Sequence, residues 1–319
     1  MKNDLFIGMD VGGTKIAAAV VEDSGKILSR HKCSTPQKAS PKEIFAAIQE
    51  AIEESLKEAG IKDDNIKAIG SGIPGIVQES TNEIMATPNI NLAGFPLAKE
   101  LEKKFKTKVA LGNDVNCGLL AEQWLGAAKG VKNVIGIFPG TGVGGAIIID
   151  GKLLTGSQGA AAEIGHMIMQ EDGPECGCGN HGCLEALISR RAIERQIREA
   201  VKKGDKTIIT ELTEGDLDQI KSKFLKKALK ENDPVVTKIM IRASEVLGTA
   251  CISLRHILNP DLFVLGGGVV EACGEFMLPI VEKTFSSDPF FSKIDNCKIV
   301  QSHLEDDAVI LGAVALVRE

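Results

Sequence analysis

The segment from Ala162 to Glu185 carries two imidazole and three thiol side chains, of which one imidazole and the three thiols could together bind a metal ion. His166, Cys176, Cys178 and Cys183 make a set of four soft ligands. Such a set favours tetrahedral zinc over calcium or magnesium. Buried structural thiols are the alternative, but the residues between the cysteines are mostly glycine and offer no apolar core. His181 is a second candidate nitrogen ligand, although it lies inside the tight cysteine loop, where chelation is more strained. We predict a zinc site that uses His166.

Two carboxylates, Glu163 and Glu185, flank this ligand set. Four protein ligands would leave zinc without an open position for chemistry, so the metal would serve to hold its loop rigid. We therefore expect a polar ligand to bind beside the zinc and these carboxylates to be available to it.

Three glycine-rich turns follow apolar runs, and each could bind phosphate. Glycines let the backbone approach a phosphate closely with several N–H groups, and a threonine hydroxyl adds a side-chain donor. A tight hairpin would explain any one turn, but three turns at strand ends favour a nucleotide site. The turns are Gly12, Gly13 and Thr14; Gly140, Thr141 and Gly142; and Gly266, Gly267 and Gly268.

Two charged residues border the first of these turns. Asp10 precedes it and is a candidate partner for the Mg²⁺ that accompanies ATP phosphates. Lys15 follows it and either contacts phosphate or faces solvent as an ordinary strand lysine.

The pair Asn113-Asp114 ends a predicted strand and opens a predicted helix. An aspartate at such a position is an ordinary helix N-cap. The alternative is that Asp114 is a general base that takes a proton from a hydroxyl attacking the γ-phosphate, while Asn113 hydrogen-bonds the same substrate.

Strands and helices alternate along the chain, which predicts mainly parallel α/β sheets. The Ser40-Pro41-Lys42-Glu43 sequence predicts a capping box, with Gly60 ending the helix. Because a second strand follows the first glycine turn, a dinucleotide fingerprint or a Walker loop does not fit. The predicted strands are residues 5–10, 16–21, 26–31, 66–72, 109–113, 134–138, 144–149 and 262–265, and the predicted helices are 41–59, 115–127, 185–202, 216–230, 233–258 and 307–317.

The second half of the chain repeats the pattern of the first. Residues 7–14 resemble residues 135–142, which suggests two related α/β lobes with a ligand cleft between them. We expect an N-terminal lobe of residues 1–117, joined by a C-terminal helix at 304–319, and a C-terminal lobe of residues 118–303 with the zinc loop.

Composition excludes several classes of function. The 319 residues exceed one typical domain of ~100–200 residues, and the net charge of −6 argues against a nucleic-acid partner. No apolar run approaches the ~18–20 residues of a membrane span, so we expect a soluble, cytoplasmic protein without a membrane partner. The cysteines outside the cluster are scattered and are expected to be reduced thiols.

Together these motifs resemble those of the ROK family of bacterial sugar kinases and sugar-responsive repressors. The resemblance covers nearly the whole chain, and its most specific part is the cysteine loop together with Glu163-Ile-Gly-His166. It implies a two-lobed actin-like, hexokinase-type (ribonuclease H-like) ATPase fold that transfers phosphate from Mg²⁺-ATP to the 6-hydroxyl of a hexose. The remaining matching segments are Asp10-Val-Gly-Gly-Thr-Lys15, Asn113-Asp114, Gly140-Thr-Gly142 and Cys183-Leu-Glu185.

Transferred position by position, the resemblance makes Asp114 the catalytic base. His166 would bind zinc through one ring nitrogen and donate to a sugar hydroxyl through the other. The nucleotide phosphates would contact Gly12, Gly13, Thr14, Thr141, Gly142, Gly267 and Gly268. The sugar contacts would be Gly75, Asn113, Asp114, Glu163, His166 and Glu185.

Two features depart from the family pattern. Pro139 precedes the second phosphate turn and removes one possible N–H donor, which weakens the expectation of ATP contact there. The Ser189-Arg190-Arg191 stretch is more basic than is typical.

The resemblance favours glucose as the substrate and a homodimer as the assembly. Kinases for fructose, mannose, N-acetylglucosamine or N-acetylmannosamine are alternatives, because a few hydrogen bonds decide among related sugars. A sugar-sensing repressor would need an additional N-terminal DNA-binding domain, for which the first strand at Leu5 leaves no room. A non-catalytic, chaperone-like ATPase would leave Glu163 and Glu185 without a purpose.

Overall fold

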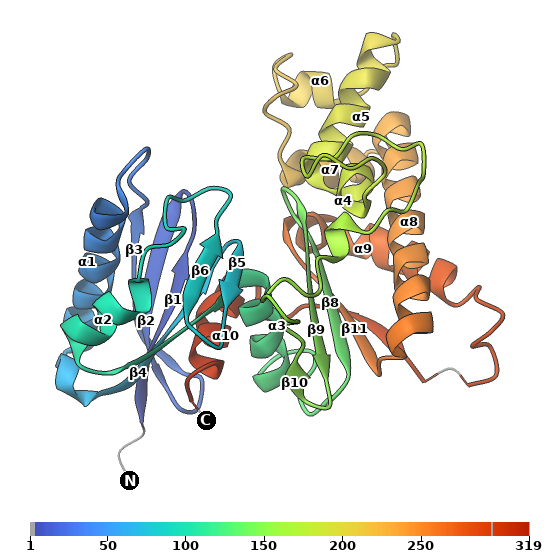
Figure 1. The fold of residues 1–319 in the computed structure, drawn as a ribbon. Coiled ribbons are helices and arrows are strands. Elements are labelled where there is room, and N and C mark those ends of the chain that lie inside the picture. The colour runs from blue at the N-terminus through green and yellow to red at the C-terminus, as the bar shows by residue number, and fades with distance from the viewer. Residues whose placement is uncertain (1–3, 295, 319) are drawn as a thin grey trace. The chain divides into compact units, whose positions relative to one another are not determined.

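The computed structural model describes residues 4–294 and 296–318. It contains two five-stranded mixed sheets, each accompanied by helices (Figure 1). By contacts the chain divides into two compact units. Unit 1 comprises Met1–Gly130, Leu153–Ala162 and Asp306–Glu319, and unit 2 comprises Val131–Lys152 and Glu163–Glu305.

The sheet of unit 1 has the strand order β3-β2-β1-β4-β7. The first three strands pair antiparallel, whereas β1, β4 and β7 pair parallel, so their carboxyl ends lie at one edge. The short β5 and β6 form a separate hairpin. The bounds are β1 Leu5–Val11, β2 Lys15–Glu22, β3 Ile27–Ser34, β4 Ile66–Ile73, β5 Ile76–Gln78, β6 Glu83–Ala86 and β7 Lys108–Asn113.

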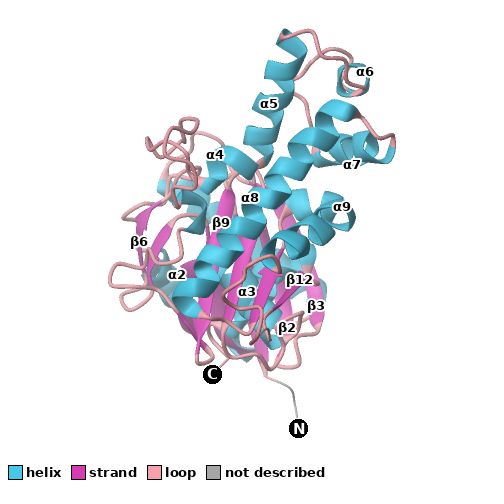
Figure 2. Ribbon diagram, turned by 90° about the vertical axis from the view of Figure 1, so that its right-hand side faces the viewer, coloured by secondary structure: helices cyan, strands magenta, loops and turns pink. Residues whose placement is uncertain are grey.

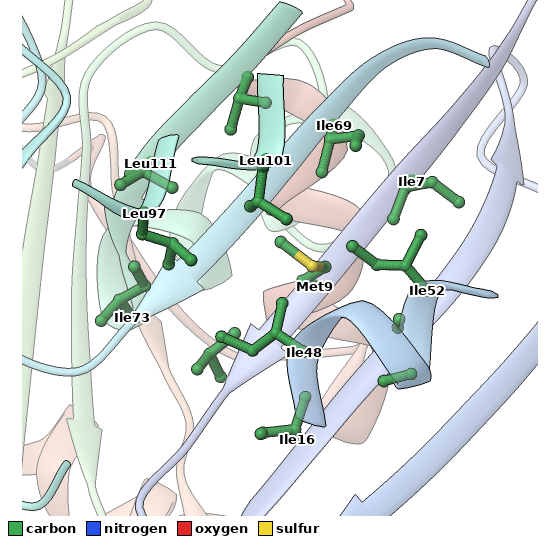
Figure 3. Close-up of a cluster of buried hydrophobic side chains, with 14 of the residues drawn as sticks. Ile7, Met9, Ile16, Ile48, Ile52, Ile69, Ile73, Leu97, Leu101 and Leu111 are labelled. Atoms are coloured by element: carbon green, nitrogen blue, oxygen red, sulfur yellow. The ribbon is translucent and has the colours of Figure 1, made fainter. Parts of the chain in front are cut away.

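One face of this sheet is covered by α1 (Pro41–Ala59) and α2 (Leu97–Phe105). The predicted capping box is confirmed, since Ser40 and Glu43 bond each other's backbone N–H groups and Gly60 ends α1 in the left-handed conformation. Figure 3 shows aliphatic side chains of both helices meeting those of the strands. Among them are Ile7, Met9, Ile48, Ile52, Leu97 and Leu101, all of which are buried.

The other face packs against α3 (Asp114–Trp124) and α10 (Ala308–Ala315). The chain comes so close that a β-carbon on Gly70 would lie 1.8 Å from the carbonyl oxygen of Ala313. Only glycine fits at this position, so the C-terminal helix is bound tightly to the first sheet. The chain also contains three short 3₁₀ turns among its described residues: η1 Asp63–Asn65, η2 Ile164–His166 and η3 Glu305–Asp307.

The sheet of unit 2 repeats that of unit 1. Its order is β10-β9-β8-β11-β12, with β8 antiparallel to β9 and parallel to β11, and β11 parallel to β12. Each sheet therefore starts from a hairpin and continues with two parallel strands on its other side, and the predicted internal repeat is confirmed. The bounds are β8 Val134–Pro139, β9 Val143–Ile149, β10 Lys152–Leu153, β11 Leu262–Leu265 and β12 Lys298–Gln301.

The helices α4 to α7 of unit 2 lie beyond one end of its sheet, as both ribbon views show (Figures 1 and 2). The longest helix, α8, starts at the predicted Asp233 cap and packs against α9. No helix in residues 4–294 or 296–318 has both the length and the apolar character that crossing a bilayer requires. The bounds are α4 Leu184–Ile188, α5 Arg190–Lys202, α6 Ile209–Leu212, α7 Ser222–Lys230, α8 Pro234–Leu258 and α9 Gly268–Phe285.

Two predicted helices were wrong in extent. The helix expected over 185–202 is broken at Ser189, whose extended backbone ends α4 and whose side chain caps α5. The helix expected over 216–230 begins only at Ser222, because residues 216–221 form turns. The sequence patterns also missed α2 and α9.

The compact units are divided at other residues than the expected lobes. Residue 117 lies inside α3, which belongs wholly to unit 1 because it packs against α10. The division into functional lobes at residues 117 and 303 stays a prediction.

Candidate functional site

Three cysteines and one histidine of unit 2 converge in the segment between η2 and α4. The metal-binding atoms of His166, Cys176, Cys178 and Cys183 all lie within 4.8 Å of one another. The structure therefore places His166 with the three cysteines. His181 is exposed, and its backbone pairs with that of Glu175.

The spacing of these atoms fits a tetrahedral zinc ion. The sulfurs of Cys178 and Cys183 are 3.7 Å apart, and the Cys176 sulfur is 3.7 Å from Nδ1 of His166. Two sulfurs at ~2.3 Å from zinc and at the tetrahedral angle would be about 3.8 Å apart. Since Nδ1 faces the cysteines, Nε2 is the ring nitrogen available to another partner.

The environment of the cysteines sets what thiolate ligands would require here. Burial raises the pKa of Cys176 and raises that of Cys183 to about 12, whereas a backbone hydrogen bond from Asn180 lowers the pKa of Cys178. A thiolate at Cys183 therefore requires a nearby positive charge, which zinc would supply.

Glu185 in α4 connects the cysteine cluster to the second glycine turn. Its Oε2 accepts a hydrogen bond of 2.9 Å from the backbone N–H of Val143, and its Oε1 lies 3.7 Å from the sulfur of Cys176. A β-carbon on Gly142 would lie 2.3 Å from Oε2, so the turn needs glycine for the carboxylate to approach. Glu163 precedes η2 and is exposed.

The second glycine turn joins β8 to β9 and is tied to the start of α5. The backbone N–H of Gly140 donates to Gly142, and that of Arg190 donates to the carbonyl of Gly140 at 2.9 Å. The Arg190 guanidinium also donates through Nη2 to Oγ1 of Thr141 at 2.9 Å. Reasoning from sequence missed this contact, although the basic stretch after Ser189 was a signal for it.

The third glycine turn differs from the first two. It follows β11 but leads into a helix, because Gly267 is the N-cap of α9 and Gly268 its first residue. The expected turn at a strand end is thus the amino end of an 18-residue helix, whose backbone N–H groups favour an anion.

The first glycine turn in unit 1 is a β1–β2 hairpin, as predicted. The N–H of Gly12 donates to the carbonyl of Lys15, the hydroxyl of Thr35 donates to Gly12, and the side chain of Gln37 donates to Gly13. Thr14 is exposed and Lys15 is half-buried at the start of β2.

Asn113, and not Asp114, is the N-cap of α3. Its Oδ1 accepts from the backbone N–H groups of Val115 and Asn116, and its Nδ2 donates to the carbonyl of Gly75 at 2.9 Å. Asp114 is the first residue of the helix and accepts from Val115 at 2.9 Å. The capping alternative for Asp114 was therefore wrong, and the Gly75 loop is held beside the pair.

Asp10 lies at the carboxyl end of β1, and its carboxylate is repelled by the negative charge of Asp114. Burial, with the charge of Asp114 second, raises the pKa of Asp10 to about 6, while Lys15 acts in the opposite direction. Two carboxylates at the ends of parallel strands are a suitable environment for a divalent cation.

We expect this raised pKa to make Mg²⁺-free protein less stable as pH rises. The Asp10 carboxyl costs no stability below its ordinary pKa of 3.8, and stability is lost as pH rises toward about 6, where the folded state ionises. Between about pH 4.5 and about pH 7.5 the loss from this group is roughly 2 kcal/mol. Urea unfolding of wild type and Asp10→Asn without added Mg²⁺ measures it; curves of the same pH dependence in both would contradict the expectation.

This chain is similar to known proteins over nearly its whole length. The model of the ROK family matches residues 6–319. A glucokinase of Thermotoga maritima is 34% identical over 98% of this chain and 97% of that protein. The xylose repressor of Caldicellulosiruptor bescii is 31% identical over 98% of this chain and 77% of the repressor. The crystal structure of a ROK family glucokinase from Streptomyces griseus in complex with glucose and AMPPNP has a TM-score of 0.82 and 33% identity, covering 98% of this chain and 99% of that one.

The fold and the cysteine cluster thus define an α/β protein of the actin-like, hexokinase-type ATPase class. The chain belongs to the ROK family, and the resemblance found in its motifs is confirmed.

Proposed function

We propose that the protein is a glucokinase that transfers the γ-phosphoryl group of ATP to the 6-hydroxyl of D-glucose. The observation that carries the proposal is the position of Asp114 at the start of α3, with the cap supplied by Asn113 and with Asp10 nearby. Full-length similarity to glucokinases, one of them solved with glucose and AMPPNP, supports the same activity.

In unit 1, Asp114 accepts the proton of the 6-hydroxyl as its oxygen attacks the γ-phosphorus. The bond from that phosphorus to the bridging oxygen breaks, and ADP leaves. The remaining N–H of the Asn113 amide donates to the sugar, because its other groups are used by the cap and by Gly75.

In unit 2, the sugar is bound by Glu163, His166 and Glu185. Nδ1 of His166 belongs to the cysteine cluster, so Nε2 donates to a hydroxyl. His166, Cys176, Cys178 and Cys183 would hold zinc, which would supply no reaction step and would fix the imidazole and the loop.

The phosphates of ATP are assigned to the three glycine turns and to Lys15. Asp10 would be the carboxylate that holds Mg²⁺ or its water, and the ion would neutralise phosphate charge when bound with ATP. The assigned phosphate-binding residues are Gly12, Gly13, Thr14, Gly140, Thr141, Gly142, Gly267 and Gly268.

We further propose a cytoplasmic enzyme that feeds glycolysis as a homodimer. The long helix α8 gives this dimer little support, because Met240, Leu247 and Leu254 are buried within unit 2 and, among the described residues, only Ile241 and Ile257 are large exposed apolar side chains of this helix.

A coupled assay with ATP tests the substrate. We expect the highest kcat/KM for glucose in a panel with fructose, mannose, N-acetylglucosamine and N-acetylmannosamine. Each hydrogen bond that a related sugar lacks is expected to lower kcat/KM by roughly ten- to a hundredfold. A higher kcat/KM for one of the other sugars would assign the kinase to that sugar.

Similarity to a xylose repressor gives the second candidate, a sugar-sensing regulator. The same assay separates the two, since a regulator shows no sugar-dependent ATP consumption. Binding to operator DNA that is released by sugar, together with no turnover on any sugar, would replace the kinase proposal.

A further inference from the structure

We propose that Arg190 is a positioning residue for the phosphoryl donor, which orients the hydroxyl of Thr141 and adds a positive charge to the second glycine turn. This inference rests on the proposed function in assigning phosphate to that turn. No residue of α5 was among those assigned to the nucleotide.

The first two residues of the turn are each bonded to Arg190. Its backbone N–H donates to the carbonyl of Gly140 at 2.9 Å, and its Nη2 donates to Oγ1 of Thr141 at 2.9 Å. Its Nε lies 3.2 Å from Oε1 of Glu194 one helical turn on, and the Glu194 side chain is only 13% exposed. The guanidinium is thus held between a carboxylate on its own helix and the hydroxyl of the turn.

This contact determines which way the Thr141 hydroxyl donates. A guanidinium has N–H donors only, so Oγ1 is the acceptor in the bond from Arg190. The single hydrogen of Thr141 is then directed to another acceptor, and Thr141 is exposed, so a bound phosphate oxygen is accessible to it. Arg190 fixes the hydroxyl as a donor to an anion.

Cations at the start of α5 oppose the helix dipole, and Glu194 pairs with one of them, Arg190. The first turn of α5 reads Arg190-Arg191-Ala192-Ile193, so two cations stand at the end of the helix where its dipole is positive. Cations are disfavoured at this end, whereas phosphate is favoured there. A phosphate at the neighbouring turn would be attracted both by this end of the helix and by the Arg190 guanidinium.

A stabilising role does not account for the contact as well. The Arg190 side chain is 34% exposed and Thr141 is exposed, so the hydrogen bond between them contributes little to folding. The turn itself begins after Pro139, which offers no backbone N–H. The guanidinium supplies hydrogen-bond donors next to the position where the backbone lacks one.

The test measures nucleotide affinity separately from sugar turnover. For Arg190→Met we expect the Kd of AMPPNP, by calorimetry, and the KM of ATP to rise about five- to twentyfold, with the KM of glucose within about twofold. Arg190→Lys keeps the charge but not the planar donor geometry, and its Kd should fall between the two. In a Thr141→Val background, Arg190→Met should add less than about threefold.

Arg191→Met is the matched control, because it removes the same charge from the same helical turn at an exposed side chain. It should leave the Kd of AMPPNP within about twofold of wild type. An unchanged Kd in Arg190→Met, an equal rise in Arg191→Met, or fully additive effects with Thr141→Val would each overturn the inference. If wild type fails to phosphorylate glucose, the proposed function fails, and the AMPPNP measurements still decide the role of Arg190.

Discussion

Replacing Asp114 by Asn is expected to lower kcat for glucose phosphorylation by about a thousandfold or more, because general-base catalysis contributes roughly 10²–10⁴ and no other carboxylate is assigned to the attacking hydroxyl. The Asn113 cap stays intact in this variant, and an amide oxygen at position 114 can still accept from Val115. The Kd of glucose should therefore stay within about tenfold of wild type. A coupled assay gives kcat, and calorimetry gives the Kd.

Asp23→Asn is the matched control for this variant. It makes the same chemical change in unit 1, at an exposed carboxylate in the β2–β3 turn. Wild-type activity is expected there. If Asp114→Asn phosphorylated glucose at the rate of wild type, Asp114 would not be the base. If the variant lost its glucose affinity together with its activity, the residue would serve binding rather than the transition state.

The position of Asp114 shows where reasoning from sequence ends. Asn and Asp are almost equally good N-caps, so the pattern alone left the cap of α3 open between two neighbours. A tertiary contact decides it: the Asn113 amide also bonds the carbonyl of Gly75, which is 38 residues away in sequence. Local preference cannot anticipate a partner that only the fold brings near.

The central strands of both sheets were predictable, whereas the short β5, β6, β10 and β12 were missed. Apolar runs and glycine turns repeat in the two halves of the chain, and the same strand order follows in both units. By contrast α9 starts at a glycine pair and contains Pro279, two features that normally speak against a helix. The Ser189 break was hidden because apolar spacing continues from α4 into α5, while the cap that separates them is a single side chain.

Removing one cysteine of the cluster is expected to affect both metal content and sugar binding. In Cys183→Ser the zinc content should fall from about one per chain to a small fraction, because a serine hydroxyl is a poor ligand for zinc in a thiolate site. Cys183 directly precedes α4 and is fully buried. Its loss frees both the imidazole of His166 and the start of the helix that carries Glu185. The Kd of glucose should rise at least about tenfold, as when the groups that orient a site are removed.

His181→Ala provides the matched control for the zinc site. Its imidazole is the nitrogen ligand nearest to the cysteines in sequence, yet the fold leaves it exposed and outside the cluster. Metal analysis of this variant should give the zinc content of wild type, with an unchanged Kd of glucose. Loss of zinc in His181→Ala, or full zinc in Cys183→Ser, would show that the ligand set is wrong. Loss of zinc without weaker sugar binding would instead separate the metal from the substrate, because the proposed mechanism lets zinc act on the sugar only by fixing the imidazole and the loop.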